Sequence, residues 1–166
     1  VLNESDSTVE FSTPGLKIDL GGVAKGYAVD RAIEKIKQAG IDNCLINAGG
    51  EVYCLGNNRG RPWKVAIKNP RGSGVKGFLE LKDQAVATSG DYEQFFIAQN
   101  KRYAHILDPR TGYPAQKAVE AVTVTADSGL TADVLATAIC VLGAEKAREL
   151  IKKYPGARIV SVQIDK

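Results

Sequence analysis

The chain has 166 residues, of which 44% are hydrophobic and 25% are charged, as in an ordinary globular protein with one buried core. The formal net charge is +3, and 22 basic residues are scattered among 19 acidic ones, so the charge pattern does not indicate a nucleic-acid-binding protein. No apolar stretch approaches the roughly 20 residues of a membrane span. The three cysteines, Cys44, Cys54 and Cys140, fit neither a disulfide framework nor a zinc site, and we expect each to be buried.

The first half of the chain shows alternating strand patterns around one helical pattern. The helix is predicted from Ala24 to Gln38, because Val29, Ile33 and Ile36 fall on one face and Gly40 follows as a natural C-terminal stop. Short strands are predicted before it at 9–11 and 16–20, around the turn Thr13-Pro14-Gly15, and after it at 43–48, 51–55 and 63–67, the last closed by a turn at 69–72.

The second half begins with strands and ends with two helices. Residues 77–81 and 84–88 resemble a hairpin or two adjacent strands, and a short irregular element is expected at 91–96. Strands are then predicted at 101–106, 121–126 and 158–164, and helices at 130–142 and 145–154. Grouped strands with a few helices between them predict an α+β fold with a largely antiparallel sheet, and we expect residues 1–166 to form a single domain.

The first segment that can carry chemistry runs from Asp19 to Arg31. A strand pattern ends in Gly21-Gly22, and a helix begins with Lys25 in its first turn. Glycines let the backbone approach a ligand closely, and the free N–H groups of a helix start favour phosphate. The spacing is neither that of a P-loop nor that of a dinucleotide-binding motif, so an ordinary tight turn is the alternative.

Two further segments place hydroxyl groups and the single histidine beside glycine turns. Thr88-Ser89 precedes Gly90 at a strand end, which suits either ligand binding or a plain turn. His105 lies three residues before Asp108 and just ahead of a turn that is rich in proline and glycine. Histidine is well suited to proton transfer near neutral pH, although a lone histidine can also be structural.

A fourth segment places Asp133 and Thr137 four residues apart, and therefore on one face of a helix. Carboxylate and hydroxyl oxygens are hard ligands that suit magnesium. The alternative is a carboxylate that is favourable near a helix N-terminus and a threonine that bonds back to a carbonyl.

Seven segments in one order, from about Lys17 to the C-terminus, together resemble the ApbE-type FAD:protein FMN transferases. In this sequence they are Asp19-Leu-Gly-Gly-Val-Ala-Lys-Gly-Tyr27, Asn47-Ala-Gly-Gly-Glu51, Trp63-Lys-Val-Ala-Ile67, Thr88-Ser-Gly-Asp-Tyr92, His105-Ile-Leu-Asp-Pro-Arg-Thr-Gly112, Val122-Thr-Val124 and Ala132-Asp-Val-Leu-Ala-Thr137. The resemblance implies a T-fold-like α+β architecture. It also implies a magnesium-dependent enzyme that moves FMN from FAD to a threonine hydroxyl of an acceptor protein and releases AMP.

The resemblance also implies roles for individual residues. The magnesium ligands would be Asp133, Thr137 and a backbone carbonyl near Gly22, and the proton acceptor would be His105 or Asp108. The flavin and diphosphate pocket would be lined by Gly22, Lys25, Asp30, Asn47, Gly49, Gly50, Ile67, Thr88, Ser89, Tyr92 and His105.

The resemblance further implies acceptors among the membrane subunits of ion-pumping redox complexes, no nucleic-acid partner, and a location outside the cytoplasm. Members of this family usually carry a substantial portion before the Asp-Leu-Gly-Gly segment, and we expect this chain to lack it. A magnesium-dependent FAD pyrophosphatase and a non-catalytic FAD-binding module are the alternatives, because both need the same pocket.

Overall fold

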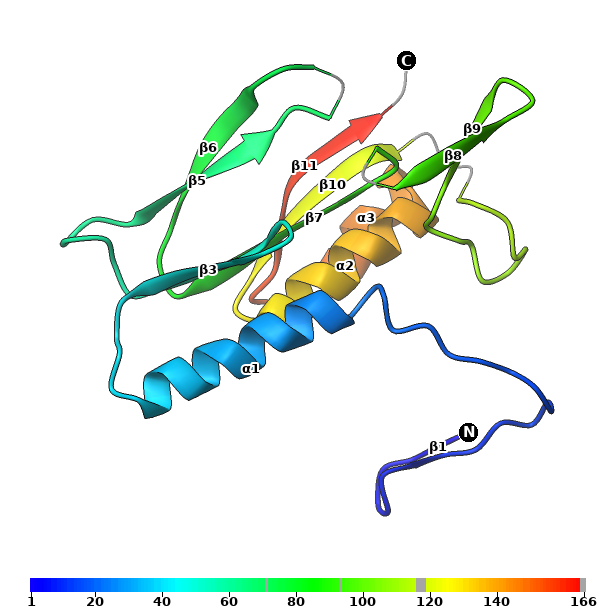
Figure 1. Ribbon diagram of the computed structural model, residues 1–166, viewed down its shortest axis with the longest axis horizontal. Helices are drawn as coiled ribbons and strands as arrows, with labels where there is room; N and C mark the ends of the chain where they lie inside the picture. Colours follow the sequence, from blue (N-terminus) through cyan, green and yellow to red (C-terminus); the bar gives the residue numbers. More distant parts are fainter. Residues whose placement is uncertain (71, 93, 116–118, 165–166) are drawn as a thin grey trace.

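The computed structural model describes residues 1–70, 72–92, 94–115 and 119–164 (Figure 1). Its largest sheet has five strands in the order β11-β10-β7-β4-β3, and every neighbouring pair in it is antiparallel. These strands are β3 (Cys44–Ala48), β4 (Glu51–Leu55), β7 (Gln84–Gly90), β10 (Val119–Ala126) and β11 (Arg158–Ile164). Three helices accompany the sheet: α1 (Ala24–Gln38), α2 (Gly129–Leu142) and α3 (Ala144–Ile151). The predicted α+β fold with antiparallel sheets is confirmed.

Both faces of the five-stranded sheet are covered. The main core lies between one face and the helices, where Tyr53 and Leu55 pack with Leu135 and Ile139. On the other face lies the hairpin of β5 (Trp63–Lys68) and β6 (Val75–Leu81), which buries Val52, Cys54, Leu81 and Val86 in a second cluster. Successive residues of a strand point to opposite faces, and both faces of this sheet are covered, so all five residues of β4 are buried.

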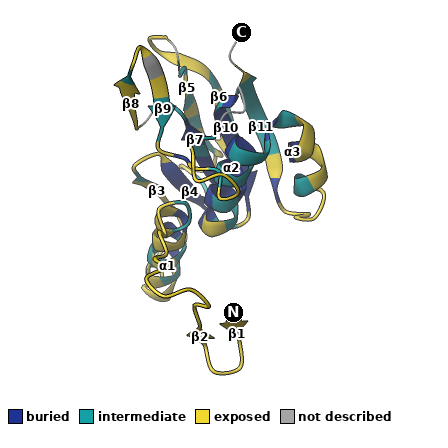
Figure 2. Cartoon of the chain, turned by 90° about the vertical axis from the view of Figure 1, so that its right-hand side faces the viewer, coloured by how far each residue is buried: buried dark blue, intermediate teal, exposed yellow. Residues whose placement is uncertain are grey.

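Helix α1 lies against α2 and against the edge of the sheet formed by β3 and β4 (Figures 1 and 2). Val29 and Ile33, the predicted apolar face, are 1% and 4% exposed, and burial of side chains of this size contributes about 1.5–3 kcal/mol each. Gly40 has φ +75°, so it supplies the left-handed stop that the sequence predicts.

The two helices meet at glycines, which lets their backbones approach closely. A Cβ added to Gly26 would lie 2.3 Å from the Gly129 carbonyl oxygen and 2.7 Å from the Asp133 Cβ. Any side chain larger than hydrogen at residue 26 would therefore push α2 away from α1.

The N-terminal prediction was wrong. Residues 16–20 form no strand, and Leu16, Ile18 and Leu20 are exposed. The alternating pattern alone does not make a strand, because none of the described strands pairs with this segment. The short strand β2 (Thr8–Val9) instead pairs with β1 (Leu2–Asn3) through a turn that contains Ser7 at φ 55°.

Strands β6 and β7 do not form the predicted pair. The two-residue link Lys82-Asp83 suggests a hairpin, but β6 pairs with β5 and β7 enters the five-stranded sheet between β4 and β10. The physical reason is burial, because most of β7 is buried and this is only possible in the centre of the sheet.

The segment expected to be irregular at 91–96 also differs, because its last two residues begin β8 (Phe95–Ala98), which pairs with β9 (Lys101–Ala104). Two residues of predicted loops, Arg71 and Glu93, lie outside the described residues.

The cysteine prediction holds in most respects. The three cysteines form no disulfide with one another, Cys54 and Cys140 are buried, and Cys44 is half-buried rather than fully buried. None of the helices in the described ranges is long and apolar enough to span a bilayer.

Candidate functional site

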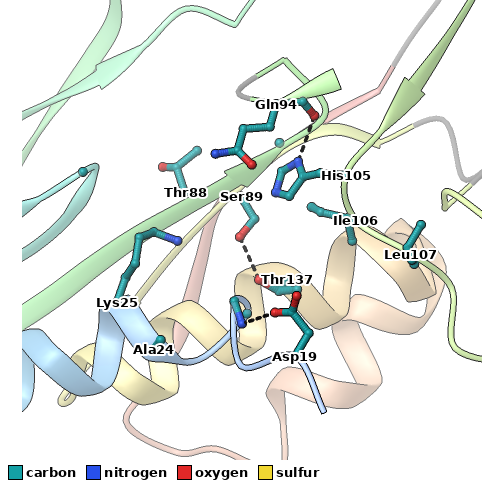
Figure 3. A pocket seen from close by; sticks show the side chains of 14 residues that line it. Asp19, Ala24, Lys25, Thr88, Ser89, Gln94, His105, Ile106, Leu107 and Thr137 are labelled. Carbon is teal, nitrogen blue, oxygen red and sulfur yellow. Dashed lines mark hydrogen bonds between the residues drawn. The ribbon is translucent and has the colours of Figure 1, made fainter. Parts of the chain in front are cut away.

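A cavity of about 850 Å³ opens where the start of α1, the end of β7 and the segment after β9 come together (Figure 3). It gathers predicted site residues from segments that are far apart in the sequence. Those that line it are Gly22, Lys25, Gly49, Thr88, Ser89, His105 and Thr137.

A second cavity of about 350 Å³ lies between the β5–β6 hairpin and the sheet. The remaining predicted binding residues other than Asp30 line it: Asn47, Gly50, Ile67 and Tyr92. Thr88 lines both cavities, so one long ligand could extend from the first into the second.

Lys25 forms an ion pair with a buried carboxylate. Its Nζ lies 3.1 Å from Oε1 of Glu51, whose side chain is 3% exposed while that of Lys25 is 44% exposed. Glu51 is the first residue of β4, directly after the Gly49-Gly50 turn, and the turn packs against the Lys25 side chain. Burial raises the pKa of Glu51, and the Lys25 charge opposes that shift.

Asp133 reaches the same turn of α1 from the facing helix. It is 1% exposed, and its Oδ2 accepts a hydrogen bond of 2.9 Å from the Gly26 N–H. Its Oδ1 is buried and has no hydrogen-bond partner among the described residues. Burial raises the pKa of Asp133, while the Gly26 N–H and the Lys25 charge oppose that shift.

Thr137 stands one helical turn beyond Asp133, on the cavity wall. Its hydroxyl lies 3.0 Å from the Ser89 hydroxyl, and a Cβ added to Gly22 would come within 3.2 Å of its methyl carbon. The predicted metal residues Gly22 and Thr137 are therefore brought together, and Asp133 lies one turn earlier on the same face of α2.

His105 presents a defined tautomer to the cavity. Its Nδ1 lies 2.9 Å from the Gln94 carbonyl oxygen, and a carbonyl can only accept. Nδ1 therefore carries the proton in the neutral ring, and Nε2 keeps its lone pair.

Three predicted residues line neither cavity, and the first of them is the buried Asp133 described above. Asp30 lines neither cavity: its carboxylate accepts the N–H groups of Gly129 and Leu130 at 2.6 and 2.9 Å, and so caps the start of α2. Asp108 also lines neither cavity, and its carboxylate pairs with the guanidinium of Arg110.

The phosphate-binding helix start is also less available than predicted. The N–H groups of Val23 and Ala24 donate to the Leu20 carbonyl, and that of Gly26 is held by Asp133. Lys25 is left as the positive group of this segment that lines the first cavity.

Sequence reasoning missed three residues at the site. Asp19 and Gln94 line the first cavity. Glu51 does not line it, but it forms the ion pair with Lys25, which does. Asp19 and Glu51 do stand in the recognised segments, but no spacing rule separates a buried carboxylate there from a solvated one.

Known proteins match nearly the whole chain. The ApbE family profile matches residues 1–160. The FAD:protein FMN transferase of Haemophilus influenzae is 39% identical over 167 residues, covering 98% of this chain and 48% of that protein. The crystal structure of the ApbE protein of Thermotoga maritima is 40% identical, with a TM-score of 0.83, and covers 100% of this chain and 56% of that one. The flavin transferase ApbE of Vibrio cholerae is 36% identical, with a TM-score of 0.79 over 96% of this chain and 52% of that one. The chain thus spans about half the length of the relatives it matches.

Proposed function

The chain belongs to the ApbE family, and from this premise we propose that its two cavities bind FAD and that the complete protein transfers FMN to a threonine hydroxyl of an acceptor protein. The observation that carries the proposal is the convergence of Lys25, Thr137 and His105 on one cavity. A cation, a hydroxyl beside a buried carboxylate and a proton acceptor are the groups that transfer from a diphosphate requires.

The two cavities suit the two parts of such a ligand. FAD has flat rings joined by a negatively charged diphosphate, and Lys25 places an ammonium group at the wall of the larger cavity. The smaller cavity offers apolar and aromatic surface from Ile67 and Tyr92, with the ammonium of Lys68 5.6 Å from the centre of the Tyr92 ring. We propose that the diphosphate lies near Lys25 and that a ring extends past Thr88 into the smaller cavity.

The residues at the α1–α2 crossing fit a magnesium ion. Asp133 has a buried oxygen without a partner in the part of the chain that the structure describes, and Thr137 lies one turn further along α2, in contact with Gly22. We propose that the Thr137 hydroxyl and the Gly22 carbonyl join Asp133 as ligands. No group of three or more His, Cys, Asp or Glu side chains is clustered among the described residues, so a metal here has few protein ligands. That suits magnesium, which keeps waters and substrate phosphates in its shell. When bound, magnesium neutralises negative charge on the diphosphate.

His105 is the proposed proton acceptor. The threonine proton passes to Nε2, and the threonine oxygen forms a bond to the phosphorus on the FMN side. The bond from that phosphorus to the bridging oxygen breaks, and AMP leaves with this oxygen. Asp108 is the weaker candidate, because its carboxylate is paired with Arg110 and lies outside the lining of both cavities.

A hydrolase is the second candidate, because His105 is exposed and water could replace the threonine hydroxyl at Nε2. The test is incubation with FAD and magnesium, with and without an acceptor domain that carries a candidate threonine, followed by mass spectrometry. AMP together with an acceptor that has gained one FMN supports the transferase, and free FMN with AMP supports the pyrophosphatase. FAD binding without products supports the non-catalytic module.

The proton acceptor has its own test. His105→Ala should abolish product formation at saturating FAD and magnesium, while Asp108→Ala should retain it. Full activity of His105→Ala would exclude His105 from this role.

The partner and the location rest on the family alone. We propose that the acceptors are membrane subunits of ion-pumping redox complexes, that the protein acts outside the cytoplasm, and that residues 1–166 behave as one domain. Thermal unfolding tests the last point, since a single domain should unfold in one cooperative transition, and two separate transitions would contradict it.

A further inference from the structure

Two buried carboxylates contact one turn of α1, one from the sheet and one from α2. Glu51, from the sheet, contacts the ammonium of Lys25 at 3.1 Å, and Asp133, from α2, accepts the N–H of the next residue, Gly26, at 2.9 Å. Their exposed fractions are 2% and 1%. Both are therefore removed from water, where a carboxylate is costly unless it is paired.

Each carboxylate uses only one of its oxygens in these contacts. Oε2 of Glu51 and Oδ1 of Asp133 are buried and find no hydrogen-bond partner in the described residues. Lys25 is the positive group that acts on both, and it favours the charged form of each. When both carboxylates are ionised, they and the one ammonium give this cluster one net negative charge, which a further cation would neutralise.

We infer that Glu51 is a positioning residue for the cation site: it holds Lys25 away from Asp133 and leaves the cluster the net negative charge that a divalent cation neutralises. Without Glu51, the ammonium of Lys25 would be drawn to the unpaired oxygen of Asp133, which is the other buried carboxylate at this turn. The inference rests on the proposed metal site, and it adds a residue that touches neither the metal nor the substrate.

Charge counting predicts the order of cation affinity in four proteins. Lys25→Met leaves two negative charges and should bind a divalent cation most tightly. The wild type and the double variant Lys25→Met/Glu51→Gln each keep one net negative charge, so their cation affinities should be similar. Glu51→Gln has no net charge and should bind the cation most weakly. A unit charge a few Å away in a protein interior changes an affinity by about tenfold or more, so the steps should be easy to measure.

The probe is Mn²⁺ binding to the whole chain, followed by the loss of free-ion signal in electron paramagnetic resonance, without FAD. Glu34→Gln is the matched control, because Glu34 belongs to an exposed ion pair with Arg31 on the same helix. Melting curves check that each variant is folded. If Lys25→Met does not fold, because it leaves Glu51 buried and unpaired, the comparison of Glu51→Gln with the double variant still decides.

The expected result is at least about a tenfold loss of Mn²⁺ affinity in Glu51→Gln and its recovery in the double variant. Wild-type affinity in Glu51→Gln, or no recovery in the double variant, would overturn the inference. The outcome is separable from the proposed function. If the four proteins bind Mn²⁺ in the predicted order but the wild type leaves FAD intact, only the proposed function is refuted. If the wild type cleaves FAD but the four affinities do not follow that order, only the role of Glu51 is refuted.

Discussion

Gly26→Ala is the substitution that most directly probes how the α1–α2 crossing builds the site. A Cβ at residue 26 would stand 2.3 Å from the Gly129 carbonyl oxygen and 2.6 Å from its carbon, both of which are backbone atoms. No side-chain rotation relieves such a contact. Because ordinary non-bonded contacts lie at about 3.5–4.0 Å, the two helices would have to separate by about 1 Å.

The cost has three parts. Overpacking typically costs about 1–3 kcal/mol. Separation also lengthens the 2.9 Å hydrogen bond from the Gly26 N–H to Asp133, and a bond to a charged group contributes about 1.5–3 kcal/mol. The higher helix propensity of alanine offsets at most about 1 kcal/mol of this loss in stability. The net loss is about 3 kcal/mol, which corresponds to a fall in melting temperature of about 6–12 °C for a chain of this size.

Thermal unfolding followed by circular dichroism measures this loss. Gly77→Ala is the matched control, because a Cβ there meets no atom within 4 Å, and we expect its melting temperature to change little. If Gly26→Ala melted within about 2 °C of the wild type, the close backbone contact between the helices would be refuted.

Three further predictions concern other buried groups. Asp30→Ala should lower the free energy of unfolding by about 2 kcal/mol in urea, and Asp30→Asn by about half of that, because the alanine leaves the N–H groups of Gly129 and Leu130 without their acceptor. Burial raises the pKa of Glu51 above its ordinary value of 4.5, so the folded state binds more protons than the unfolded state just above that pH, and its stability falls as the pH rises. Glu51→Gln lacks this effect, so its stability relative to the wild type should increase between about pH 4 and about pH 7, and an unchanged difference would contradict the pKa direction. Burial raises the pKa of Cys54 to about 11, so iodoacetamide should leave Cys54 unmodified in the folded protein and alkylate half-buried Cys44 first, as peptide mass mapping would show.

The sequence predicted those helices and strands whose bounds are set by their own apolar pattern and neighbouring turns. The bounds of α1, β4 and β11 agree with the sequence, because α1 has a helical apolar period and β4 and β11 are short, mostly apolar segments that begin soon after a glycine. Long-range pairing was not predictable in the same way. Lys82-Asp83 has the length of a hairpin turn, but burial of β7 on both faces placed that strand in the centre of another sheet.

The site residues likewise divide into those that local spacing predicts and those that only the tertiary fold brings together. Asp133 and Thr137 share a helix face by spacing, and the structure places Thr137 beside Gly22 and Ser89. Asp30 belongs to the same sequence segment as Gly22 and Lys25. The rotation of helix α1 turns its carboxylate away from the cavities and toward the start of α2. Glu51 could not be assigned, because its partner is 26 residues earlier and only the folded sheet brings the two together.

The most direct test of the central claim is AMP release from FAD by this chain in the presence of magnesium, compared with the same measurement on Asp133→Ala. Chromatographic separation of the nucleotides gives the rate without any knowledge of the acceptor. The proposed site predicts magnesium-dependent AMP release by the wild type and a loss of at least about a hundredfold in the variant, since a metal-held charge in the transition state is worth several kcal/mol. Equal rates in the two proteins, or no release by a wild type that binds both FAD and magnesium, would contradict it.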